Sequence, residues 1–115
     1  FRFGPTWVFL LTEDHSWVAE RLKEGVLTRT EAERHPYRNV LTRALGLPEA
    51  RFDLVEVRLA PGEGVLLVTD GLYGHVPEEE WRLGRDLQAS LEAMVAEALR
   101  RGGDDNVTAV ALRVE

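Results

Sequence analysis

Residues 62–71 read Gly-Glu-Gly-Val-Leu-Leu-Val-Thr-Asp-Gly, and this stretch decides the fold. Residues 65–68 are all apolar, so a strand formed here needs cover on both faces, and the pattern predicts a buried central strand. Residues 55–59 alternate apolar and charged side chains, which indicates a strand with one face in water. The Ala-Pro-Gly-Glu-Gly of residues 60–64 is typical of a turn. We therefore predict a hairpin of residues 55–59 and 65–68.

Upstream of this hairpin, the sequence predicts one strand and one capped helix. Residues 7–11 are aromatic and apolar and indicate a short strand within the opening segment 1–11. Ser16 suits the N-cap of a helix over residues 17–24, and Gly25 suits its end.

The segment between this helix and the hairpin predicts two further helical stretches. Thr30 and Glu33 have the spacing of a capping box, which places a helix start at Thr30. Pro36 must interrupt that helix because it lacks an amide hydrogen. Residues 37–45 are then expected to continue as helix up to Gly46, giving a helix-turn-helix-like insert between strands.

Downstream, residues 77–81 are expected to form a single helical turn, and a longer helix follows it. Apolar residues at helical spacing give that helix one apolar stripe: Leu87, Leu91, Met94, Val95, Ala98 and Leu99. Gly102 suits its C-cap, and residues 107–114 read as a last apolar strand. The order β, α, α, β, β, α, β with a hairpin predicts an α+β fold, an antiparallel sheet with flanking helices.

Composition excludes several classes of function. The 115 residues carry a net charge of −6 and no cluster of Lys and Arg, so a nucleic-acid or basic membrane-surface role is not expected. There is no cysteine, which excludes disulfides and thiolate chemistry and fits a cytoplasmic location. Apolar runs are too short to span a membrane. The chain begins at Phe1 and its one methionine is Met94, so we expect that residues upstream are absent.

Two aspartates are the candidate metal ligands. Asp70 follows the strand at 65–69, and Asp105 precedes the strand at 107–114. If these strands are antiparallel neighbours, both carboxylates lie at one rim of the sheet, where they repel each other unless a cation lies between them. Hard oxygen ligands suit Mg²⁺ or Mn²⁺, and such a metal can activate water for hydrolysis. Asp-Gly and Gly-Gly-Asp-Asp-Asn are also ordinary turn sequences, so the residues alone leave a metal site and a structural turn both open.

Four stretches carry a resemblance to a known family. Residues 12–16 resemble a T-x-D-H-S segment, and residues 31–46 resemble E-A-x-x-H-P-x-R-N-x-L-T-R-A-L-G. Residues 62–72 are similar to G-D-x-L-L-L-x-S/T-D-G-L, and residues 102–108 match G-G-x-D-N-V/I-T. All four occur in the order found in type 2C (PPM) metal-dependent serine/threonine protein phosphatases, and the second points to the bacterial branch. Together they cover nearly the whole chain.

The resemblance implies a fold, a reaction and a metal site. The fold is part of an α-β-β-α sandwich, of which residues 1–115 are the C-terminal portion of a single phosphatase domain, with residues of about 17–46 as a flap bordering the site. The site holds two or more Mn²⁺ or Mg²⁺ ions, with Asp70 and Asp105 matching family ligands, while Asp104 occupies a variable position. The substrates are phosphorylated serine and threonine side chains of proteins.

The family's N-terminal half has no counterpart here. It supplies a phosphate-contacting arginine, an early acidic residue, a bridging D-G-x-x-G aspartate and a G-D-S-R segment. The family often has an acidic residue soon after D-G-L, whereas here Leu72 is followed by Tyr73-Gly74-His75. We therefore expect the isolated chain to be inactive, and unpaired strand edges to favour oligomers. The alternative is a non-catalytic, phosphatase-like interaction module.

Overall fold

The computed structural model describes residues 1–48 and 50–115. The chain divides into two compact units. The first consists of residues 1–11 and 57–115 and contains the sheet and the longest helix, whereas the second consists of residues 12–56 and contains two short helices.

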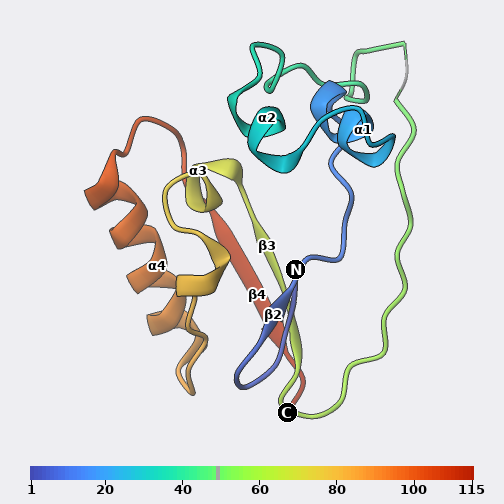
Figure 1. Cartoon of the computed structure of the whole chain (residues 1–115). Helices are drawn as coiled ribbons and strands as arrows, with labels where there is room; N and C mark the ends of the chain where they lie inside the picture. The colour runs from blue at the N-terminus through green and yellow to red at the C-terminus, as the bar shows by residue number, and fades with distance from the viewer. Residues whose placement is uncertain (49) are drawn as a thin grey trace. The chain divides into compact units, whose positions relative to one another are not determined.

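The first unit is built on a four-stranded antiparallel sheet with strand order β2-β1-β3-β4 (Figure 1). Its strands are β1 Arg2–Phe3, β2 Val8–Phe9, β3 Gly64–Val68 and β4 Ala109–Arg113. The segment predicted as one strand is thus a hairpin, β1 and β2. Its turn is closed by a hydrogen bond from the Gly4 amide to the Trp7 carbonyl, 2.9 Å long. A side chain at Gly4 would collide with the Trp7 ring, since an added Cβ would lie 2.3 Å from it.

The predicted hairpin of residues 55–59 with 65–68 is wrong. Residues 51–60 form no strand in the described chain, although Val57 and Leu59 are half-buried and Arg58 between them is exposed. The physical reason is that β3 has only two edges. Strand β4 pairs with all five residues of β3 on one edge, and β1 pairs with Gly64 and Val65 on the other.

Helix α4, Leu87–Arg101, supplies the cover for one face of this sheet. Its N-cap is Asp86, whose Oδ1 accepts a hydrogen bond from the Ala89 amide at 3.1 Å, and its C-cap is Gly102, as predicted. The predicted turn at 77–81 is the 3-10 helix η1, Glu78–Glu80, and a four-residue helix α3, Asp70–Tyr73, follows β3 directly. The core cluster comprises Phe3, Leu66, Leu72, Val76, Trp81, Leu91, Met94 and Ala98. This is the α+β arrangement that the sequence predicts.

The opposite face of the sheet carries exposed apolar side chains. Leu67 of β3 is 66% exposed, and Val110 and Leu112 of β4 are 57% and 62% exposed. Strand β3 is therefore central, as predicted, but only one of its faces is buried. Leu66, on the covered face, is fully buried, which matches the alternation of side chains along a strand.

The second unit contains the helices α1, Trp17–Lys23, and α2, Arg29–Arg34. Ser16 caps α1 as predicted, with its Oγ accepting from the Ala19 amide at 3.2 Å. The capping box of α2, in contrast, is formed by Thr28 and Glu31 and not by Thr30 and Glu33. Both pairs have the required spacing. The residue before Pro36 is pushed out of the helical region, so a start at Thr28 allows a longer helix before that stop.

The predicted helix at 37–45 is also wrong, because this segment forms successive turns. His35 precedes Pro36 and is extended, with φ −68° and ψ 141°, so the helix ends at Arg34. An isolated antiparallel bridge between Ser16 and Leu41 then holds the segment. Beside this bridge the Val40 carbonyl accepts a hydrogen bond from the Trp17 amide. This bond takes the place of the one that Val40 would accept within a helix.

Among the described residues, no helix is both long enough and apolar enough to cross a membrane.

Candidate functional site

The candidate site lies in the first unit, at the rim where β3 ends and β4 begins. The β3–β4 register pairs Val68 with Ala109, and the pairing continues past both strands. The Thr69 amide donates to the Thr108 carbonyl at 3.0 Å. The Thr69 hydroxyl accepts from the Thr108 amide at 3.0 Å and donates to the Asn106 carbonyl at 3.3 Å. The residues that follow β3 thus lie against those that precede β4.

Gly71 brings the two segments closer than any other residue type would allow. A Cβ added at Gly71 would lie 2.1 Å from the Asn106 carbonyl oxygen and 3.2 Å from Cγ2 of Val107. Here the glycine is required by the close approach of the backbone of the neighbouring segment.

Asp70 and Asp105 are therefore carried by adjacent stretches of backbone. The residue before Asp70, Thr69, donates a hydrogen bond to the Asn106 carbonyl. The residue after it, Gly71, lies against the same carbonyl. Both aspartates are exposed, and Oδ1 of Asp105 accepts a hydrogen bond from the Asn106 amide at 2.7 Å.

Two exposed carboxylates at one rim are the donor set that a hard divalent cation accepts. Within residues 1–48 and 50–115, no three His, Cys, Asp or Glu side chains are grouped so as to hold a metal. Asp70 and Asp105, on adjacent backbone segments, are carboxylates of the kind that such a cation binds, and they remain the candidate ligands.

A histidine next to this rim was not identified from the sequence. Nε2 of His75 lies 2.6 Å from Oδ1 of Asp104, the residue before Asp105. The hydrogen bond from His75 holds the pKa of the Asp104 carboxyl below its usual range. In the sequence, the residues after D-G-L depart from the family pattern, but this departure does not indicate a contact between His75 and Asp104.

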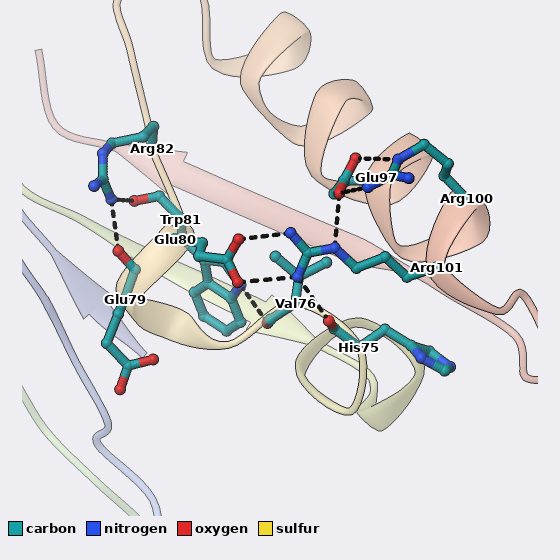
Figure 2. A network of polar contacts seen from close by, with 9 residues as sticks. All are labelled: His75, Val76, Glu79, Glu80, Trp81, Arg82, Glu97, Arg100 and Arg101. Atoms are coloured by element: carbon teal, nitrogen blue, oxygen red, sulfur yellow. Dashed lines mark hydrogen bonds and ion pairs between the residues drawn. The ribbon is translucent and has the colours of Figure 1, made fainter.

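Arg101, the last residue of α4, joins the helix to the segment that follows α3 (Figure 2). Its guanidinium binds both oxygens of Glu80, at 2.6 and 2.9 Å, and also Oε1 of Glu97 at 2.7 Å. It further donates to the carbonyl of His75 at 3.0 Å. Close by, the buried Trp81 indole donates to the Val76 carbonyl at 2.9 Å. The network fixes residues 75–81 to the helix end from which the Asp105 loop leaves.

The second unit has its own polar cluster. Nε2 of His15 lies 2.8 Å from Oδ2 of Asp53, and Arg43 donates to Oδ1 of the same carboxylate at 3.1 Å. The pKa of Asp53 is lowered, first by the hydrogen bond from His15 and then by that from Arg43. His15 thus joins segments distant in sequence. His35, in contrast, is a local turn residue, because its Nδ1 accepts from the Tyr37 amide at 3.0 Å.

The chain is similar in sequence to a known protein family and to bacterial phosphatases. The family profile described as Stage II sporulation protein E (SpoIIE) matches residues 10–115. The serine/threonine phosphatase stp of Listeria monocytogenes is 37% identical over 103 residues, which cover 85% of this chain and 41% of that protein. Protein phosphatase PhpP of Streptococcus pneumoniae is 40% identical over 103 residues, which cover 85% of this chain and 42% of PhpP.

A solved structure shares the fold. The crystal structure of the Mycobacterium tuberculosis serine/threonine phosphatase PstP/Ppp is 32% identical, with a TM-score of 0.87. The match covers 99% of this chain and 50% of the mycobacterial chain. The chain therefore spans about two-fifths of the length of the curated relatives and half of this structural one.

Proposed function

The chain belongs to the PPM, or type 2C, family of serine/threonine protein phosphatases, and we propose that it provides the C-terminal part of the metal site of an enzyme that hydrolyses phosphoserine and phosphothreonine in proteins. Its relatives are named serine/threonine phosphatase and protein phosphatase, which supports this reaction. The observation that carries the proposal is the close packing of residues 69–71 against residues 106–108, with an exposed aspartate in or next to each segment.

In this proposal Asp70 and Asp105 hold one side of a cluster of Mn²⁺ or Mg²⁺ ions. When bound, such ions lower the pKa of water and offset the charge of the transferring phosphoryl group. The two carboxylates contribute negative charge that attracts the ions and fixed oxygen positions that orient them. Thr69 and Gly71 act indirectly, because they hold the two backbone segments together.

We further propose that residues of about 17–46 act as the flap of a single phosphatase domain, with phosphorylated proteins as substrates. Support comes from the second unit, residues 12–56, which is compact and contains this whole segment. The cluster of His15, Arg43 and Asp53 joins parts of this unit that are distant in sequence.

The 115-residue chain alone is proposed to lack phosphatase activity. Two carboxylates hold a divalent ion weakly, since Mg²⁺ and Mn²⁺ sites usually add further protein or substrate oxygens. Hydrolysis of p-nitrophenyl phosphate by the purified 115-residue chain with Mn²⁺, at a rate comparable to that of the full-length protein, would contradict this part.

The main test uses the full-length protein and the substitutions Asp70→Asn and Asp105→Asn, which keep side-chain size and remove charge. Each is expected to abolish Mn²⁺-dependent hydrolysis of a phosphothreonine peptide and to weaken Mn²⁺ binding measured by calorimetry. Glu92→Gln is the matched control: it also removes one charge, and its amide oxygen can still accept from Gln88 as Glu92 does at 3.1 Å.

Full activity in both aspartate variants would overturn the metal assignment. A wild-type full-length protein that folds but hydrolyses no phosphopeptide with Mn²⁺ or Mg²⁺ would instead support the non-catalytic module.

A further inference from the structure

We propose that His75 is a positioning residue for the candidate metal ligand Asp105, acting through Asp104 and Gly102. The inference rests on the proposed function, because it assigns a role to a residue outside the ligand set of the same site. It concerns the loop from Gly102 to Asn106, which leaves α4 and leads into β4.

Two contacts of the His75 ring constrain this loop. Nε2 lies 2.6 Å from Oδ1 of Asp104, and because a carboxylate can only accept, Nε2 carries the proton of this hydrogen bond. The ring also lies against Gly102, where an added Cβ would be 2.6 Å from Cε1. Gly103 follows with φ +61°, a left-handed conformation that favours glycine. The loop thus bends tightly around the ring before it reaches Asp105.

His75 is itself held in place from three directions. Its amide donates to the carbonyl of Leu72 at 3.1 Å, and Leu72 is fully buried. Its carbonyl accepts from Arg101 at 3.0 Å, and Arg101 is fixed by Glu80 (Figure 2). The next residue, Val76, is buried in the core. The ring therefore projects from a rigid segment towards an otherwise exposed loop.

The pair is suited to fixing geometry more than to stabilising the fold. Asp104 has a side chain that is 76% exposed, and exposed ion pairs contribute little to global stability. A ligand, in contrast, must be held within a fraction of an ångström of its productive position. Loss of the His75–Asp104 contact should release the Asp105 loop while leaving the core intact.

The test measures Mn²⁺ affinity in the full-length protein by calorimetry, together with the melting temperature in EDTA. His75→Ala and Asp104→Ala are each expected to weaken Mn²⁺ binding by about 10-fold, the lower end of the loss seen when direct partners of metal ligands are removed, because both act on Asp105 indirectly. The double variant should be no weaker than either single variant, because both break one contact. His75→Gln should restore most of the affinity, because Nε2 of glutamine can donate to Asp104. Glu92→Gln is the control for a general effect of surface substitution.

The melting temperature in EDTA separates positioning from a merely structural role. It should stay within about 2 °C of wild type in all of these variants, since exposed pairs are worth little. Unchanged Mn²⁺ affinity in His75→Ala, additive losses in the double variant, or a melting temperature that falls in step with affinity would each overturn the inference. Failure of the proposed function looks different, because Asp70→Asn and Asp105→Asn would then leave Mn²⁺ binding unchanged.

Discussion

Replacing Gly71 by alanine tests whether the rim is held together by close backbone contact. The new methyl carbon would lie 2.1 Å from the Asn106 oxygen and 3.0 Å from the Asn106 carbonyl carbon. Close carbon–oxygen contacts in proteins are about 3.3 Å or longer, so the two segments must separate by roughly 1 Å. Overpacking of this kind costs about 1–3 kcal/mol of folding free energy. A displacement of 1 Å at a catalytic site can lower the rate by about 100-fold.

The assay compares Gly71→Ala with Gly84→Ala in the full-length protein. A Cβ at Gly84 would lie 3.5 Å from the Ser90 hydroxyl, an ordinary contact, so this variant controls for the added methyl group. Urea unfolding gives the stability difference, and phosphopeptide hydrolysis with Mn²⁺ gives the rate. Equal stability and equal rates in Gly71→Ala and Gly84→Ala would show that close backbone contact at Gly71 does not hold the rim together.

Three further predictions concern other contacts. Thr28→Ala should destabilise the full-length protein by about 1 kcal/mol in urea unfolding, whereas Thr30→Ala should have little effect. The reason is that Thr28 caps α2 and Thr30 does not. Equal effects of the two substitutions would contradict this assignment. Thr69→Val should cost about 1 kcal/mol in the same assay, since the Asn106 carbonyl and the Thr108 amide lose a partner, and Thr69→Ser should retain stability; a stable valine variant would argue against this role. Hydrogen bonds from Arg100 and Arg101 lower the pKa of Glu97 from 4.5 to about 2, so their contribution is present above pH 4.5 and is lost as pH falls towards 2. Glu97→Gln should therefore lose less stability than wild type between these pH values in thermal melts, and identical pH profiles would refute this.

Local signals in the sequence predicted local structure well. The cap at Ser16 and the end of α4 at Gly102 were confirmed because each depends on a few neighbouring residues. The predicted apolar stripe of α4 was confirmed except at Leu99, which is 53% exposed. The capping box was displaced by two residues because the sequence offers two copies of the same spacing, and only the effect of Pro36 distinguishes them.

Pairing between strands could not be read in the same way. The alternation in residues 55–59 is typical of a strand, but the edge it would need on β3 is taken by β1. A two-residue strand such as β1 is too short to show an alternating pattern, so the sequence does not reveal that β1 occupies this edge of β3. The choice of neighbours is a property of the whole sheet.

For the candidate site, motifs indicated Asp70 and Asp105 as candidate ligands but not the contacts of the residues beside them. The contact between His75 and Asp104 joins two positions that the family motifs leave variable, and neither residue indicates the other. The contact depends on the packing of the end of α4 beside the segment after α3, which the sequence does not show.

Thr69 and Asn106 are 37 positions apart, so we expect the rim to close only when the chain up to β4 is in place. Closing so long a loop carries an entropic cost that contacts made within one helix do not. A nascent chain that has reached Arg101 already contains Asp70 but has no Asp105 to set beside it. We therefore expect this rim to assemble late in folding, and an ion that bound only the finished rim would draw the equilibrium towards the folded state.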